Sequence, residues 1–247
     1  MGKEFEKPAE AEVPATPEQV WEAIATGPGI DSWFLGRNRV EDGKVESDFP
    51  GIPATDIEVW DPPRRLLHSS RSAEDGRFIA YEYLVEGRDR STTLVRLVTS
   101  GFIPGDDWQD EFEAMGTGGE LFFGTLVQYL THFAGQTATP VTVFGPMVDD
   151  PGRVWDRFTS AVGLEHDPRP GDRVRISGIG PEPIEGTVYL RNRDTVGIRS
   201  GDALYRFIAG FQGPFIATHH LFTEADPSAA TATWERWLGQ IDAERKT

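Results

Sequence analysis

Apolar residues recur at helical spacing in two short stretches of the chain that open in the same way. Residues 17–34 read PEQVWEAIATGPGIDSWF, and residues 151–164 read PGRVWDRFTSAVGL. Each stretch starts with Pro, reaches Val, Trp and an acid three residues later, and then repeats apolar residues at the spacing of a helix with one buried face. We predict two short amphipathic helices with Trp21 and Trp155 in the core. Two copies of one helix signature favour two domains.

Both helices carry start and stop signals. Thr16 and Gln19 form a capping box around a proline, so the first helix is expected to begin at residue 17. The Gly-Pro-Gly at 27–29 is expected to stop this helix, because Pro cannot continue the hydrogen-bond ladder. Asp150 and Gly163 mark the start and the end of the second helix in the same way.

Much of the remaining sequence alternates between apolar and polar residues. Between residues 36 and 102, alternating runs are separated by turn sequences such as Asp-Gly and Pro-Pro, which predicts an antiparallel meander. Residues 3–13 are a poor strand by propensity but stand in the place of a first strand. Residues 106–133 return to helical spacing, and the GTGG at 116–119 is expected to separate a short turn from a long closing helix. The predicted order is strand, helix, several strands, long helix.

The second half of the chain repeats this order. A strand precedes the second amphipathic helix, short alternating runs follow it, and a closing helix is predicted at about 228–243. The sequence GQTATP at 135–140 is expected to form the boundary between the two halves. We therefore predict two domains, at 1–135 and 136–247.

Composition and charge limit the possible partners. Forty acids stand against 24 bases, for a net charge of −16, and most of the excess lies in residues 1–135. This charge repels nucleic acid and anionic membranes and so argues against both as partners, whereas a basic protein is compatible with it. No apolar run is long enough to cross a bilayer, and the first residues do not resemble a signal peptide, so we expect a cytoplasmic protein. Without cysteine, the chain has no disulfides and no thiolate sites.

Several motifs occur in an order that resembles a known family. They are VWEAIATGPGIDSWFLG near the start, DPPRRLLHS in mid-sheet, LVRLVTSGF before the long helix, and a Gly-Gly that opens this helix. The series resembles the START-like (SRPBCC) superfamily, in the branch named after the activator of a heat-shock-protein ATPase and placed with polyketide-cyclase-like proteins. The resemblance covers most of 1–135 and is weaker over 136–247. It implies an α+β helix-grip fold, with a curved antiparallel sheet around a long C-terminal helix, in two tandem lobes.

The resemblance also implies an apolar cavity between sheet and helix as the binding site. Tyr81 and Tyr83 share one alternating face of a strand, so their hydroxyls would enter the cavity if that face points inward. The alternative is that both rings pack in the core with locally satisfied hydroxyls. Trp33 and Phe34 would form a gate at the mouth, and four residues of the long helix would line its far side unless they are simply core. The full predicted set is Trp33, Phe34, Tyr81, Tyr83, Phe112, Met115, Phe122 and Leu126.

Signatures of catalysis and of cofactors are few. None of the five histidines has the spacing of a metal site, and GTGGE lacks the Lys and the Ser or Thr of a phosphate-binding loop. We therefore expect no metal ion and no other cofactor. Acid–base chemistry by Tyr81, Tyr83, Arg64 or His68 stays open as an alternative.

Three functions are compatible with these observations. The first is a non-catalytic carrier or sensor that binds a small hydrophobic molecule. The second is an enzyme of the cyclase or dehydratase type acting on a polyketide-like substrate, in which one tyrosine would be essential for turnover. The third is a protein-interaction module of the chaperone-cofactor kind, which would have filled cavities and an exposed docking patch.

Overall fold

The chain folds into two compact α+β units, which are described here one at a time. They are the first unit, Met1–Thr137, and the second unit, Ala138–Thr247. The computed structural model describes residues 2–70, 73–89, 91–106, 108–148, 150–178, 183–209 and 213–243. No helix among these described residues has the length and apolar character needed to cross a membrane.

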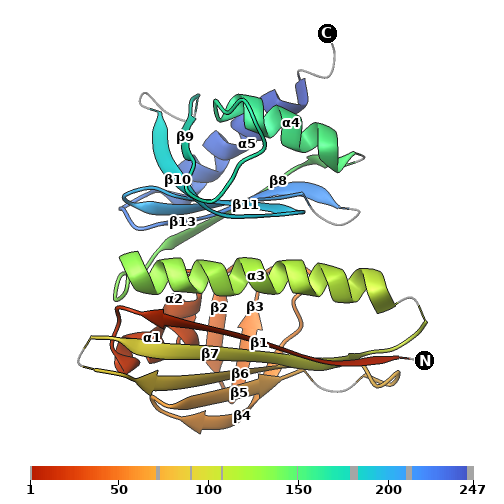
Figure 1. Cartoon of the computed structure of the whole chain (residues 1–247), viewed down its shortest axis with the longest axis vertical. Coiled ribbons are helices and arrows are strands. Elements are labelled where there is room, and N and C mark those ends of the chain that lie inside the picture. Colours follow the sequence, from red (N-terminus) through yellow and green to blue (C-terminus); the bar gives the residue numbers. More distant parts are fainter. Residues whose placement is uncertain are drawn as a thin grey trace. The chain divides into compact units, whose positions relative to one another are not determined.

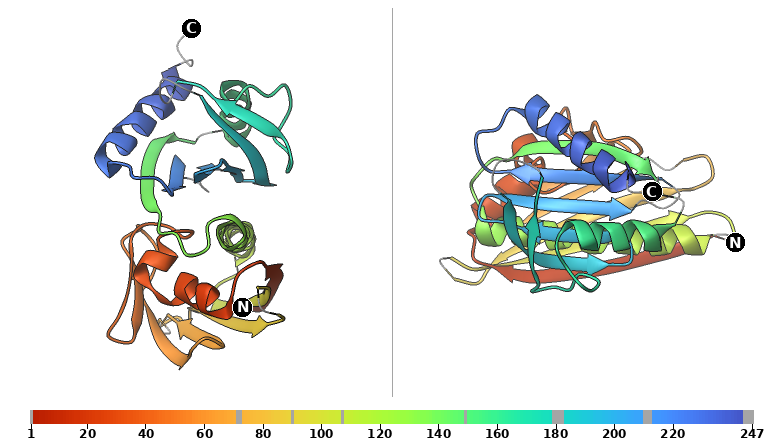
Figure 2. Two further views of the ribbon diagram at one scale, coloured as in Figure 1. Left: turned by 90° about the vertical axis from the view of Figure 1, so that its left-hand side faces the viewer. Right: turned by 90° about the horizontal axis from the view of Figure 1, so that it is seen from above.

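The first unit is a seven-stranded antiparallel sheet with its helices on one face (Figures 1 and 2). The strand order is β1-β7-β6-β5-β4-β3-β2, so the strands form a meander and the first strand pairs with the last. This is the helix-grip arrangement that the resemblance implies. The elements are β1 (Lys3–Val13), α1 (Pro17–Ala25), α2 (Gly27–Ile30), β2 (Asn38–Glu41), β3 (Lys44–Ser47), β4 (Thr55–Asp61), β5 (Arg65–Ser69), β6 (Phe78–Gly87), β7 (Thr93–Ile103) and α3 (Trp108–His132).

The strand β1 forms in spite of its weak propensity. It pairs with β7 over its whole length, from Lys3 opposite Ile103 to Val13 opposite Thr93. Its residues alternate between exposed and half-buried, with glutamates at most of the exposed positions. Long-range pairing therefore outweighs the intrinsic preference of this segment.

Both ends of α1 are as predicted, but the segment that follows it forms a helix that was not predicted. Thr16 Oγ1 accepts a hydrogen bond from the backbone N–H of Gln19, and the Gln19 side chain accepts one from the Thr16 N–H, which completes the capping box. The helix ends at Ala25, directly before the Gly-Pro-Gly that was expected to stop it. This Gly-Pro-Gly itself forms the start of the short helix α2. The reason is that Thr26 caps α2 and places its proline in the first turn, where the missing N–H costs nothing.

The two signature tryptophans differ in burial. Trp155 is 6% exposed and belongs to the core of the second unit, as predicted. Trp21 is half-buried, and its ring packs edge-on against Trp60, which is 47% exposed. Trp21 therefore lies at the edge of the core, and its prediction as a core residue is only partly correct.

The long helix α3 runs without interruption through the glycine-rich segment, so the predicted break there is wrong. Its second half buries Leu121, Leu126 and Leu130 against the rest of the first unit. Glycine lowers helix propensity by only about 1 kcal/mol per residue, and burial of this face outweighs that cost.

Replacing Gly119 by alanine is expected to stabilise the protein by about 1 kcal/mol, because a methyl group there meets no atom within 4 Å and alanine favours the helix. The free energy of unfolding from urea titration measures this gain. Gly43→Ala is the control, since Gly43 also faces open space but has a φ of +73°, so alanine should destabilise it. Equal effects of the two substitutions would contradict an uninterrupted helix at Gly119.

The second unit repeats the topology with one strand fewer. Its six-stranded antiparallel sheet has the order β8-β13-β12-β11-β10-β9, again with the first strand beside the last. The helix α4 begins after an Asp150 cap and is followed by Gly163 with a φ of +74°, as predicted. The elements are β8 (Thr139–Met147), α4 (Pro151–Ala161), β9 (Arg173–Ile176), β10 (Ile184–Asn192), β11 (Thr195–Arg199), β12 (Ala203–Ala209), β13 (Pro214–Leu221) and α5 (Pro227–Ala243).

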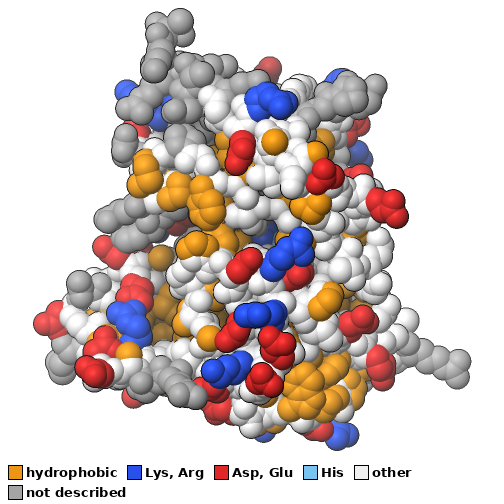
Figure 3. All heavy atoms as spheres, turned by 180° about the vertical axis from the view of Figure 1, so that it is seen from behind, with side chains coloured by type: hydrophobic (Ala, Val, Ile, Leu, Met, Phe, Trp, Pro, Cys, Tyr) orange, Lys and Arg blue, Asp and Glu red, His pale blue; other side chains and the backbone are white. Residues whose placement is uncertain are grey.

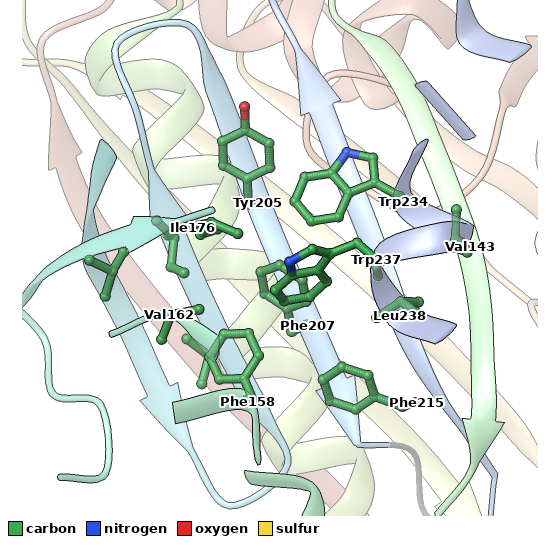
Figure 4. Close-up of a cluster of buried hydrophobic side chains, with 14 of the residues drawn as sticks. Val143, Phe158, Val162, Ile176, Tyr205, Phe207, Phe215, Trp234, Trp237 and Leu238 are labelled. Carbon is green, nitrogen blue, oxygen red and sulfur yellow. The ribbon is translucent and has the colours of Figure 1, made fainter. Parts of the chain in front are cut away.

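Aromatic side chains fill the space between sheet and helices in the second unit (Figure 4). Phe207 on β12 is fully buried, and its ring centroid lies 4.7 Å from that of Phe158 on α4 and 5.6 Å from that of Trp237 on α5. Phe215 and Trp234 complete the cluster. The interior of this grip is therefore occupied by the protein's own rings.

Acidic side chains are intermixed with Lys and Arg on the face of the molecule drawn in Figure 3. Acidic side chains of both units form ion pairs, such as Arg39 with Glu46 at 3.1 Å and Arg193 with Asp194 at 3.1 Å. This arrangement is that of a well-solvated surface.

Candidate functional site

The first unit contains a pocket between the sheet and the segment that follows α1. Its apolar wall is formed by Ile24, Ile30, Trp33 and Phe34, and its other walls come from β3, β4, β5 and β6. The volume is about 50 Å³, which is room for about four water molecules. At the rim, Pro53 is exposed.

Four of the eight predicted site residues line this pocket, namely Trp33, Phe34, Tyr81 and Tyr83. Alternation along β6 places both tyrosines on the inner face of the sheet, where Tyr83 is 5% exposed. Tyr81 pairs across the sheet with His68 on β5, so that these two side chains point to the same side.

The aromatic residues at positions 33 and 34 are held by specific contacts. The Trp33 indole N–H donates a hydrogen bond to the Ala23 carbonyl at 2.9 Å, which fixes the buried ring. Phe34 packs against Trp33 at 5.5 Å and against Phe122 of α3 at 4.6 Å between ring centroids. Both rings therefore form a wall of the pocket, and their role as a gate stays a prediction.

The other four predicted residues lie on α3, outside the lining of this pocket. Leu126 is fully buried in the core, and Phe122 packs against the ring of Phe34. Phe112 packs against Phe5 and receives the Lys7 ammonium over its ring at 3.9 Å. Met115 is half-buried. A ligand contact by these residues stays a prediction, because the pocket described above faces α1–α2 and not α3.

His68 was predicted only as a candidate acid or base. In the structure it lies in the pocket wall and is 8% exposed. Its Nδ1 lies 2.8 Å from the Thr55 hydroxyl, and its ring lies 5.3 Å from that of Tyr81 and 6.1 Å from that of Tyr83. Sequence reasoning missed Thr55 altogether. The residues next to Thr55 in the sequence do not indicate that its hydroxyl is buried and paired, because its partner, His68, comes from the neighbouring strand β5.

A second missed group supports the segment that carries the pocket's aromatic wall. Asp31 is buried, and its carboxylate accepts hydrogen bonds from the backbone N–H of Asn38 at 2.6 Å and from the Asn38 amide at 3.1 Å. Burial raises the pKa of the Asp31 carboxyl, although the hydrogen bonds from Asn38 oppose the shift. Asn38 also lines the pocket.

Burial favours the neutral forms of His68, Tyr81 and Tyr83 in the pocket. It lowers the pKa of His68 to about 4 and raises the pKa of Tyr81 to about 12. The pKa of Tyr83 is raised further by burial and by the neighbouring Tyr81. Arg64, the fourth acid–base candidate, lies outside the lining, where it is exposed and paired with Asp61 at 3.1 Å.

Three polar atoms in the pocket wall have no hydrogen-bond partner among the described residues. They are the hydroxyls of Tyr81 and Tyr83 and Nε2 of His68, and their side chains all line the pocket. Buried polar groups are nearly always paired in folded proteins, with protein, water or ligand. The pocket therefore presents groups that a bound molecule can satisfy.

The second unit has a larger but more open groove. Its volume is about 340 Å³, and it is lined by Tyr205 and Trp234 with a rim that includes the exposed Asp202 and Asp226. We favour the pocket of the first unit as the functional site because three side chains of its lining carry polar atoms without a hydrogen-bond partner among the described residues. No group of three His, Cys, Asp or Glu side chains that could hold a metal ion occurs within the described ranges.

Comparisons with known proteins give structural neighbours only. No family model and no curated protein matches the chain. Among solved structures, the Aha1 dimer from Colwellia psychrerythraea is 17% identical and covers 51% of this chain and 96% of its own, with a TM-score of 0.43. The di-domain ARO/CYC protein BexL from the BE-7585A biosynthetic pathway is 15% identical and covers 97% of this chain and 95% of its own, with a TM-score of 0.44.

A third neighbour is DynU16 from the dynemicin biosynthetic locus. It is 17% identical and covers 96% of this chain and 98% of its own, with a TM-score of 0.40. The fold assignment itself rests on the strand order and helix positions given above.

Proposed function

We propose that the first unit binds a small, largely apolar molecule, or the ring-sized end of a longer one, and holds it without chemical change as a carrier or sensor. The observation that supports this most directly is the set of three polar atoms without a hydrogen-bond partner among the described residues, on Tyr81, Tyr83 and His68, in a pocket that also has an apolar wall. Apolar walls with a few convergent polar groups are the usual construction of a small-molecule site.

The chemistry of the pocket favours binding over catalysis. A general base works best when its pKa lies near the working pH, and burial takes the pKa of His68 down to about 4. The imidazole has Thr55 and no carboxylate beside its Nδ1, so a protonated form would have no counter-charge. The tyrosines have pKa values too high to exchange protons easily near neutral pH.

We infer that the second unit is a divergent copy of the same domain without a cavity in its grip. The shared strand order supports the common origin of the two folds, and the ring cluster around Phe207 occupies the space that a ligand would need. The protein would then carry one ligand in the pocket of the first unit.

The binding proposal is tested by fluorine NMR with 4-fluoroanisole, a one-ring probe, added to the full chain. We expect saturable binding, and we expect Val45→Phe to weaken it at least about tenfold, because Val45 lines the pocket and a larger ring would fill it. Val40→Phe is the matched control. Val40 is the cross-strand partner of Val45 and equally half-buried, but lies outside the lining.

The control variant should bind the probe as the natural protein does. Absence of binding to the natural protein, or equal binding by the Val45→Phe variant, would show that this pocket is not a ligand site.

A further inference from the structure

The hydrogen bonds around Thr55 fix which nitrogen of His68 carries the proton. The Thr55 hydroxyl lies 2.8 Å from Nδ1 of His68 and 3.3 Å from the carbonyl oxygen of Val45. A carbonyl can only accept, and a hydroxyl has a single proton to donate. Both bonds are made when Thr55 donates to Val45 and accepts from an Nδ1–H of His68.

This tautomer leaves Nε2 of His68 as a hydrogen-bond acceptor. Among the described residues nothing donates to it, and the imidazole forms part of the pocket wall. Nε2 stays unprotonated at neutral pH and can accept a hydrogen bond, because burial lowers the pKa of His68 to about 4. The rings of Tyr81 and Tyr83 lie beside the imidazole, Tyr83 nearly parallel to it with an angle of 11° between the ring planes.

The charge of the lining bears on which ligands can enter. Glu46 is the one charged residue among the fourteen that line the pocket, and it is already paired with Arg39 at 3.1 Å. The lining contains no Lys or Arg that could receive an anion. An anionic group placed in this pocket would be buried without a counter-charge, which is costly.

We infer that the pocket selects a neutral ligand that donates an O–H or N–H hydrogen bond to Nε2 of His68, with its apolar body against Trp33 and Phe34. The inference rests on the proposed binding function and assigns His68 as the residue that determines specificity. A bound ligand without such a donor displaces water from the acceptor and leaves it unsatisfied, and that loss corresponds to about tenfold or more in affinity.

The test compares three probes of one size on the full chain by fluorine NMR. They are 4-fluorophenol, which donates a hydrogen bond, 4-fluoroanisole, which replaces the donor with a methyl ether, and 4-fluorobenzoate, which is an anion. We expect the phenol to bind about tenfold more tightly than the anisole, and the benzoate more weakly than both.

Variants of His68 identify the acceptor. In His68→Leu the ratio of phenol to anisole affinity should fall to near one, and His68→Gln, whose amide oxygen can accept, should restore part of the preference. The exposed His166 of the second unit provides the control, since His166→Leu should leave the ratio unchanged. The affinity ratio is informative even if a variant is less stable, because both probes use the same folded population.

The outcomes separate this inference from the binding proposal. If neither uncharged probe binds, the proposed function fails. If both bind with equal affinity, the proposed function stands and selection by His68 is wrong. The inference that His68 selects the ligand is also wrong if the preference for the phenol survives in His68→Leu. The inference that the pocket selects a neutral ligand is wrong if the benzoate binds as tightly as the phenol.

Discussion

Replacing Phe207 by alanine is expected to lower the free energy of unfolding by about 3–5 kcal/mol, the range observed for large aromatic truncations in cores. Phe207 is fully buried and contacts rings from both helices of the second unit, including Phe158 and Trp237, as Figure 4 shows. Truncation leaves a cavity at the centre of this cluster, and the surrounding rings have few ways to close it. The effect should appear as a lower urea midpoint.

Tryptophan fluorescence is a suitable reporter of this transition, because Trp155, Trp234 and Trp237 all belong to the core of the second unit. Phe207→Leu is the matched control and should cost clearly less, since most of the apolar volume stays. A loss below about 1 kcal/mol for Phe207→Ala would contradict a well-packed interior, and it would reopen the question of a ligand cavity in the second unit.

Acidification is expected to destabilise the first unit through His68. The unfolded chain binds a proton at this histidine near the ordinary pKa of 6.5, whereas the folded protein binds it only near 4. Between these values the unfolded state holds more protons, so stability is complete above about pH 6.5 and falls as the pH falls to about 4. The total loss in the free energy of unfolding is about 3 kcal/mol and is reached near pH 4.

The measurement is the free energy of unfolding of the natural protein and of His68→Gln across this pH range. The difference between the two curves isolates His68 from the carboxylates and from His219, whose pKa is also lowered by burial. The gap between natural protein and variant should narrow by about 3 kcal/mol from neutral pH to pH 4. Parallel curves would mean that His68 is not buried as described, and would remove the basis for a neutral acceptor in the pocket.

Local signals in the sequence determined the ends of the secondary-structure elements well. The capping box at Thr16 and the Asp150 cap each involve residues within three positions, so their geometry follows from the sequence alone. The same holds for the Asp-Gly turn at 42–43, where both residues have positive φ. The glycines of α3 misled the prediction because propensity is local, whereas burial of the opposite face of that helix is not.

Half of the candidate site was accessible in the same way. Alternation along β6 put Tyr81 and Tyr83 on one face, and the break after α1 pointed to Trp33 and Phe34. Each of these inferences used only the period of a single element.

The tertiary structure decided which side chains meet. Thr55 and His68 lie 13 positions apart and come together because β4 pairs with β5, and His68 faces Tyr81 because β5 pairs with β6 in one particular register. The alternation of side chains along a strand determines the face on which each one lies. It does not determine which side chains are neighbours, because register and sheet curvature depend on pairing over the whole sheet. For that reason the sequence indicated four residues of the pocket wall, whereas only the folded chain brings His68 and Thr55 together beside them.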